Sequence, residues 1–135
     1  MFQYRTNIKL YHMDAARSFF YANIFLLFHD TLEAFLTSEG FRLNDMVENK
    51  NYLLPLVRAE ADFLNPIKMG DTLIIELSLS RLGQTSITLL YHVLVSEGTM
   101  VARGKTIHVV TGKKPNQKLK IPAELVQLFQ KLKGK

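Results

Sequence analysis

The chain has 135 residues, of which 47% are hydrophobic and 21% are charged, and it contains no cysteine. This composition is typical of one globular domain over residues 1–135, and it excludes disulfides, thiolate metal sites and a cysteine nucleophile. The net charge of +5 lies at one end, because residues 113–135 carry seven lysines against one glutamate while residues 1–112 sum to −1.

The N-terminal residues Met1–Lys9 are polar and lack the basic-plus-apolar pattern of a secretory signal. The one apolar stretch of membrane-spanning length, Phe19–Leu36, contains the polar residues Asn23, His29, Asp30 and Glu33. These favour a helix buried in protein, so we expect a cytoplasmic chain with no membrane span.

The first predicted element is an extended segment, Thr6–Met13, that runs toward Asp14. Alternation along it and the residues before it places one set of side chains on a single face: Tyr4, Ile8, Leu10, His12 and Asp14. A helix over Phe19–Ser38 follows, with Ser18 as its expected N-cap and Gly40 as its C-terminal signal. A carboxylate beside the free N–H groups of a helix start suits acyl-transfer chemistry.

Residues 41–51 are expected to form an irregular connection, with room for some helix. Alternating apolar residues then predict three strands: Val57–Phe63, ending before Pro66, Leu73–Leu79 and Ile87–Val95. A hairpin at Glu97-Gly98-Thr99 leads into a fourth, Met100–Thr111. Because residues 19–28 are apolar on nearly every side, the helix requires enclosure by this sheet, with a second subunit as a further cover. A short helix after Pro122 ends the chain, and 112–120 is the linker-like segment.

The stretch from Asp14 to Asn23 resembles the hotdog-fold acyl-CoA thioesterases, in particular the 4-hydroxybenzoyl-CoA thioesterase branch. Asp14, Tyr21 and Asn23 fall on the positions of that family's strand-to-helix motif. Later pieces agree in order: Pro66, Gly70-Asp71-Thr72-Leu73, Ala102-x-Gly104, Ile107-His108-Val109 and Ile121-Pro122. The resemblance implies an α+β hotdog fold, in which a curved antiparallel sheet wraps a long central helix and a short C-terminal helix follows.

The resemblance also implies hydrolysis of an acyl-CoA thioester to a free acid and coenzyme A. Asp14 would act as nucleophile or general base, and the backbone N–H of Tyr21 would polarise the thioester carbonyl. No metal or other cofactor is implied. The family forms dimers or tetramers, with active sites at the subunit interface and coenzyme A across the surface. Alternative roles are a capping carboxylate for Asp14 and a structural hydrogen bond for Asn23.

Candidates for the rest of the substrate site follow from their chemistry. His29 lies on the central helix near the expected pocket, with a polar role at a dimer or helix–sheet contact as its alternative. Cationic candidates for the coenzyme A phosphates are Arg81, Arg103, Lys113 and Lys114. For the tail lysines, a solvated loop and frayed terminal helix is the simpler interpretation.

One departure from the family concerns activity. Arg17 stands where the family has glycine, whose backbone reaches conformations that arginine resists. A non-catalytic acyl-CoA-binding module is therefore an alternative function. A nucleic-acid-binding module using the basic tail is disfavoured, because exposed aromatics are not interleaved with those lysines. A dehydratase of the same fold would need a catalytic histidine where Asp14 stands. The sequence leaves open the acyl group, the carrier (coenzyme A or acyl carrier protein) and the choice between dimer and tetramer.

Overall fold

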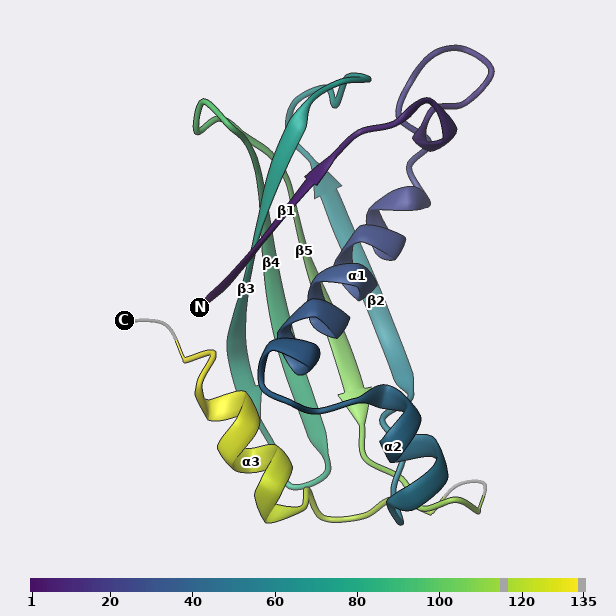
Figure 1. The fold of residues 1–135 in the computed structure, drawn as a ribbon, viewed down its shortest axis with the longest axis vertical. Helices are drawn as coiled ribbons and strands as arrows, with labels where there is room; N and C mark the ends of the chain where they lie inside the picture. Colours follow the sequence, from purple (N-terminus) through teal and green to yellow (C-terminus); the bar gives the residue numbers. More distant parts are fainter. Residues whose placement is uncertain (115–116, 134–135) are drawn as a thin grey trace.

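A computed structural model describes residues 1–114 and 117–133. Its five strands form one antiparallel sheet in the order β1-β3-β4-β5-β2. The strands are β1 (Phe2–Asn7), β2 (Leu56–Phe63), β3 (Thr72–Leu82), β4 (Ser86–Val95) and β5 (Met100–Val109). The helices are α1 (Asn23–Ser38), α2 (Leu43–Asn49) and α3 (Ala123–Gln130). The sheet curves around α1, as the hotdog fold requires (Figure 1).

The three central strands carry most of the core and confirm the predicted alternation. Each has ten or eleven residues, and along β3 and β4 buried side chains alternate with half-exposed ones, whereas β5 buries the consecutive residues Val101 and Ala102 before it alternates. Leu73, Ile75 and Leu77 of β3 are fully buried, as are Ile87 and Leu89 of β4. Because side chains alternate across a strand, this pattern places one apolar face of the sheet against the helix.

The helix α1 lies in the concave face of the sheet with one side buried and the other open. Its buried residues include Ile24, Leu27 and Phe28, whereas Leu26 is 62% exposed. The chain therefore leaves part of this apolar helix uncovered. Its C-terminal end is closed as predicted: Gly40 has φ 77°, its N–H donates to Thr37 O at 3.0 Å, and Phe41 N–H donates to Leu36 O at 2.8 Å.

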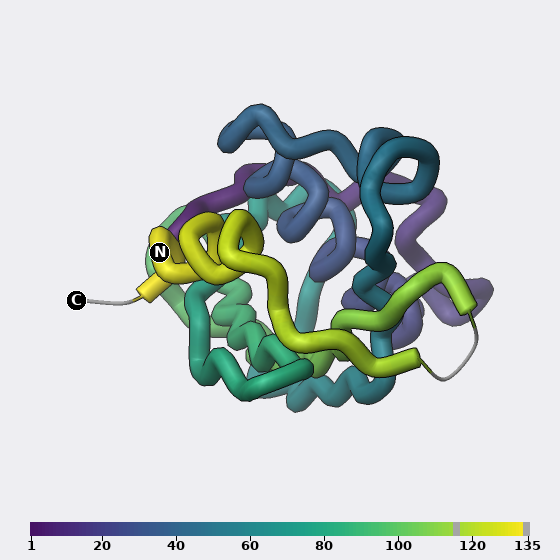
Figure 2. The backbone as a smooth tube through the Cα atoms, turned by 90° about the horizontal axis from the view of Figure 1, so that it is seen from below, coloured from purple at the N-terminus to yellow at the C-terminus, as the bar shows by residue number. Residues whose placement is uncertain are grey.

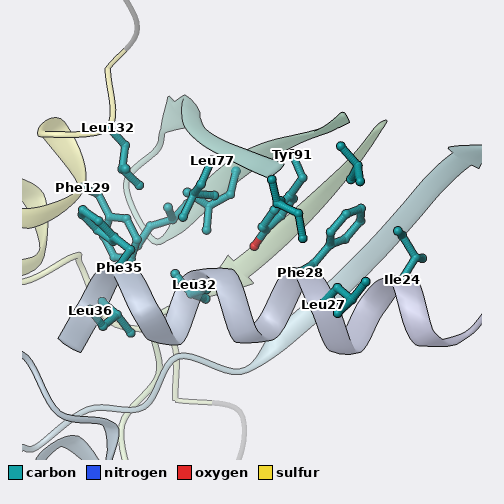
Figure 3. Packing of buried hydrophobic residues seen from close by; sticks show 14 of the residues in the cluster. Ile24, Leu27, Phe28, Leu32, Phe35, Leu36, Leu77, Tyr91, Phe129 and Leu132 are labelled. Carbon is teal, nitrogen blue, oxygen red and sulfur yellow. The ribbon is translucent and has the colours of Figure 1, made fainter. Parts of the chain in front are cut away.

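Close packing of α1 on the sheet depends on Gly104. The ring of Phe28 stacks on that of Tyr91, with centroids 4.3 Å apart and planes 12° from parallel (Figure 3). Gly104 pairs with Tyr91 in the sheet, and a Cβ on Gly104 would lie 2.5 Å from Phe28 Cζ. The absence of a side chain at Gly104 therefore serves helix–sheet packing.

The expected strand Thr6–Met13 is wrong in its bounds. β1 ends at Asn7 because Asn7 pairs with Thr72, the first residue of β3, beyond which β1 has no partner. The chain then forms a 3₁₀ turn, η1 (Leu10–His12), in which Leu10 is exposed. Leu10 and Asp14 therefore do not share the buried face of Ile8 and His12.

Two connections complete the fold. The irregular segment 41–51 contains α2, and the chain between β5 and α3 crosses the lower end of the sheet (Figure 2). That crossing is held by hydrogen bonds from Leu119 N–H to Val110 O and from Ile121 N–H to Gln84 O. α3 begins directly after Pro122, as predicted. Residues 115–116 of the linker-like segment and Lys135 of the basic tail lie outside the described residues.

Candidate active site

The loop that carries Asp14 is held between the 3₁₀ turn and the helix start. The backbone N–H of Lys9 donates to His12 Nδ1 at 2.8 Å. Burial lowers the pKa of His12, opposed by the charge of Asp30 and reinforced by that of Lys9, so the imidazole stays neutral and can accept this bond. Met13 then pairs with Phe19, which closes residues 14–18 into a small loop.

The Asp14 carboxylate organises this loop. Its Oδ1 accepts the Ala16 N–H at 2.9 Å and the Ser18 N–H at 3.0 Å. The Asp14 backbone N–H donates to Ser18 O at 2.7 Å, and its carbonyl accepts the Arg17 N–H at 3.0 Å. Within the described residues, Asp14 Oδ2 accepts no hydrogen bond. One carboxylate oxygen therefore holds the loop, while the other is left without a donor among the described residues.

The start of α1 differs from the expected one. Phe20 N–H donates to His12 O at 3.0 Å, so Phe19 and Phe20 belong to the loop and the helix begins at Asn23. Ser18 is therefore not the N-cap; Ala22 precedes the helix and supplies no side-chain cap. The first helical N–H groups bond to carbonyls three residues back. Over the part of the chain that is described, Tyr21 N–H has no acceptor and remains a free donor.

Asn23 links the helix start to the turn before the loop. Its Nδ2 donates to His12 O at 2.9 Å, the same carbonyl that accepts the Phe20 N–H. This is the structural role that sequence reasoning kept as an alternative for Asn23. It places Asn23 as a positioning residue for the loop rather than as part of the pocket wall.

Asp14 and Tyr21 line one pocket of about 1150 Å³. One wall is the 10–21 segment; the other is the end of β2, with Phe63, and the segment that follows it, with Ile67 and Met69. Arg17 and Lys68 contribute one cationic side chain from each wall. Apolar side chains around one carboxylate and a free N–H form an arrangement that can bind an acyl group and stabilise an oxyanion.

Three other candidates lie outside this pocket. His29 is exposed on α1, and its Nε2 lies 3.0 Å from Glu33 Oε2 one turn along the same helix, which is not the dimer or helix–sheet contact of its alternative role. Arg103 Nε lies 3.3 Å from Asp62 on the neighbouring strand. Arg81 is exposed near the far end of β3, beside an irregular register with β4.

Lys113 and Lys114 line a second pocket of about 590 Å³ with Pro55, Val57 and Lys118. The Lys113 Nζ also donates to Val47 O. This pocket lies at the start of β2, whereas the Asp14 pocket includes Phe63 at its end. With ~3.3 Å per residue, β2 separates the two pockets by about 20 Å. Figure 1 shows the loop between β1 and α1 at one end of the sheet and the chain that directly follows β5 at the other, so within one chain these lysines are remote from Asp14.

Sequence reasoning missed the second wall of the Asp14 pocket. Ile67, Lys68 and Met69 were assigned no role, although they follow the Pro66 that marked the end of a strand. The Asp71 carboxylate accepts the Lys68 N–H at 2.8 Å and shapes this segment. The available signal in the sequence was the Gly70-Asp71 pair, because an aspartate in a turn commonly accepts a hydrogen bond from a nearby backbone N–H.

The described residues offer neither a metal site nor a membrane-spanning helix. Residues 1–114 and 117–133 contain no cluster of three histidine, aspartate or glutamate side chains placed to hold a metal ion. No helix among them is both long and apolar enough to cross a membrane.

Comparisons with known proteins show the family and the fold. The family model of the thioesterase-like superfamily matches residues 8–129. A 1,4-dihydroxy-2-naphthoyl-CoA hydrolase of Nostoc punctiforme is 32% identical over 96% of this chain and 86% of its own length. The crystal structure of a Synechocystis 1,4-dihydroxy-2-naphthoyl-CoA thioesterase superposes with a TM-score of 0.90 at 25% identity, covering 97% of this chain and 96% of that one.

A gentisyl-coenzyme A thioesterase structure, 26% identical, superposes with a TM-score of 0.82 over 92% of this chain and 98% of that one. The resemblance stated from the sequence is thus confirmed over nearly the whole chain. The protein belongs to the thioesterase-like superfamily and has the hotdog fold of the acyl-CoA thioesterases.

Proposed function

We propose that the protein hydrolyses aromatic acyl-CoA thioesters in the pocket that contains Asp14. The observation that carries this proposal is the pairing, in one pocket, of a carboxylate with a free oxygen and a backbone N–H with no acceptor within the described residues, those of Asp14 and Tyr21. A thioester carbonyl between them would meet both a nucleophile or base and an oxyanion donor.

Two routes use the same atoms. As a nucleophile, Asp14 attacks the carbonyl carbon, the carbon–sulfur bond breaks, and water hydrolyses the resulting anhydride. As a general base, Asp14 takes a proton from water, and the water oxygen attacks that carbon instead. In both routes the developing negative charge on the carbonyl oxygen faces the Tyr21 N–H, at the positive end of α1. The thiolate of coenzyme A leaves and is protonated.

An aromatic acyl group is supported by the pocket lining and by the relatives. Aromatic side chains come from both sides, Phe19 and Tyr21 from the Asp14 segment and Phe63 from the end of β2. The relatives named above act on dihydroxynaphthoyl-CoA and gentisyl-CoA, both aromatic thioesters. Flat rings pack favourably against such walls.

The proposal includes a homodimer paired through β2. This strand is an edge of the sheet, and its Val57 and Phe63 are large apolar residues with exposed side chains. An unpaired, apolar edge is a template for pairing with a second copy. Antiparallel pairing of two β2 strands would bring Lys113 and Lys114 of one protomer beside the Asp14 pocket of its partner. There they would lie beside the coenzyme A that the partner binds and could pair with its phosphates.

A thiol-release assay over a panel of acyl-CoAs tests the function. We expect the highest kcat/KM on aroyl-CoAs, with hydroxylated naphthoyl and benzoyl thioesters above straight-chain acyl-CoAs. Retained binding of these thioesters with no release of thiol from any of them would instead establish the non-catalytic binding module. A preference for straight-chain acyl groups would contradict the aromatic assignment and leave thioester hydrolysis standing.

A further inference from the structure

Arg17 has an unusual backbone conformation in the wall of the Asp14 pocket. Its φ is 63°, and among the described residues it is the one non-glycine residue with a positive φ. That left-handed conformation brings the Cβ of an L-residue too close to the backbone and is disfavoured. Hydrogen bonds on both sides hold it in place, from the Arg17 N–H to Asp14 O and from the Ser18 N–H to Asp14 Oδ1. Such strain is concentrated at functional sites.

The side chain of Arg17 is a cation without a partner. It is exposed, lines the pocket, and makes no hydrogen bond or ion pair with any residue in 1–114 or 117–133. Asp14 lies in the same loop but forms no ion pair with the Arg17 guanidinium; its Oδ1 accepts backbone N–H groups. A guanidinium presents a planar fork of donors that matches a carboxylate in two parallel hydrogen bonds.

A second cation faces the pocket from the other wall. Lys68 lines it too, and its hydrogen bonds within the described chain are made by its backbone to Asp71. The pocket therefore has two cationic residues, one at each wall, against one carboxylate, within a mostly apolar lining. This excess of positive charge favours an anion inside the cavity.

We propose that the acyl group of the substrate carries a carboxylate, and that Arg17, with Lys68 opposite, binds it. This inference rests on the proposed thioester hydrolysis in this pocket. The anion belongs to the acyl part because Arg17 lines the same cavity as Asp14, where the thioester carbonyl must lie. The coenzyme A phosphates are separated from the thioester sulfur by the whole pantetheine arm and extend away from it.

The test uses matched substrates that differ in one charge. Thioesters of 3- and 4-carboxybenzoate are compared with their neutral carbamoyl counterparts, each on coenzyme A and on N-acetylcysteamine, which lacks the phosphates. Arg17→Gln removes the charge and retains a Cβ, and Arg17→Lys restores a cation. Arg5→Gln on β1, exposed and outside the pocket, is the matched control.

The wild type should prefer at least one carboxylated substrate on both carriers. Arg17→Gln should lower kcat/KM on that substrate on the order of 10-fold or more, with little change on its carbamoyl counterpart. Arg17→Lys should recover part of the loss, and Arg5→Gln should show none. No preference in the wild type, or equal losses on all substrates, would overturn the proposal. A loss confined to coenzyme A thioesters would assign Arg17 to the phosphates and overturn it as well.

A binding measurement keeps the inference separate from the proposed function. Non-hydrolysable carboxyphenacyl-CoA and carbamoylphenacyl-CoA, substituted at the same ring position, are titrated calorimetrically into wild type and Arg17→Gln. Weaker binding of the carboxylated analogue alone, by roughly 10-fold, would support the carboxylate site even if no thioester is turned over. Equal affinities in both proteins for both analogues would sink it whether or not the enzyme is active.

Discussion

Asp14 and Ser18 are joined by two hydrogen bonds that run in opposite directions. The Asp14 N–H donates to Ser18 O at 2.7 Å, and the Ser18 N–H donates to Asp14 Oδ1 at 3.0 Å. The first bond is backbone only, whereas the second uses the carboxylate that we assign to catalysis. Asp14 therefore has a structural role and a proposed chemical role, and variants can separate them.

The structural role predicts different stabilities for two variants of Asp14. Asparagine retains an Oδ1 that can accept the Ala16 and Ser18 N–H groups, whereas alanine leaves both to water. We expect Asp14→Ala to lower the free energy of unfolding by ~1 kcal/mol and Asp14→Asn by less than half of that. Urea denaturation measures both. Equal losses for the two variants would mean that the carboxylate oxygen does not hold the loop.

Neutralising Lys113 and Lys114 together should affect binding rather than chemistry. In the β2-paired dimer these lysines attract the coenzyme A phosphates, so the double glutamine variant should raise KM several-fold at low salt. High salt should reduce the effect because exposed charges are screened. The value of kcat, and activity on N-acetylcysteamine thioesters, should stay unchanged. Lys133→Gln, in the same basic tail but outside the second pocket, is the control.

Two outcomes would contradict the lysine assignment. An unchanged KM at low ionic strength would leave these lysines as a solvated surface. A purely monomeric protein in analytical ultracentrifugation would remove the partner pocket on which the assignment depends. Salt-sensitive binding of an oligonucleotide, without thioesterase activity, would favour the nucleic-acid alternative.

The stacking of Phe28 on Tyr91 predicts a large effect at Gly104. An added Cβ would lie 2.7 Å from Glu60 O and closer still to the Phe28 ring, and neither backbone nor buried ring can move freely. We expect Gly104→Ala to lower the free energy of unfolding by roughly 1–3 kcal/mol. The neighbour Lys105→Ala, on the opposite face of the strand, should have little effect. A Gly104→Ala variant with an unchanged Tm would show that α1 packs less closely on the sheet than described.

A row of buried polar side chains, His108, Thr106 and Tyr91, predicts that the protein loses stability in mild acid. His108 Nε2 lies 3.2 Å from Thr106 Oγ1, which lies 3.2 Å from the Tyr91 hydroxyl, and His108 Nδ1 lies 3.4 Å from Leu54 O. Burial lowers the pKa of His108 from its ordinary 6.5; the Leu54 carbonyl opposes this shift and His29 adds to it.

The folded state therefore prefers neutral His108. Its contribution to stability is present above pH 6.5 and is lost as the pH falls through the lowered pKa. We expect Tm to decline below that pH in the wild type and to decline less in His108→Gln. His92→Gln, on the outer face of the sheet, is the control. Parallel Tm profiles for wild type and His108→Gln would exclude His108 as the titrating group.

Most of the fold could be predicted from the alternation of apolar residues and from glycine and proline at the ends of elements. The long strands β3 and β4 alternate over most of their length, so their faces and approximate bounds followed from residue type, whereas β5 followed from the hairpin at Gly98. Gly40 and Pro122 marked helix ends because their backbone preferences are local. The end of β1 could not be predicted, because it depends on where β3 begins, and the pairing of these two strands is long-range.

The candidate site could be predicted from the sequence only in part. Asp14 and Tyr21 were found because one short motif contains both, and they do share a pocket. The helix start was misplaced because Phe19 and Phe20 are apolar enough for a helix, yet their backbone is used in pairing with Met13 and His12. The distance between the lysines and Asp14 could not be predicted, because it depends on which ends of β2 and β5 adjoin each pocket.

The turnover of Asp14→Asn on the best aroyl-CoA tests the central claim most directly. Asparagine is nearly isosteric and keeps the loop hydrogen bonds, but it is neither a nucleophile nor a base. We predict that kcat falls by a factor on the order of 100 or more while Tm stays close to that of the wild type. Asp45→Asn, an exposed aspartate on α2 outside the pocket, should retain full activity. Wild-type turnover by a folded Asp14→Asn protein would contradict the assignment of Asp14 as the catalytic carboxylate.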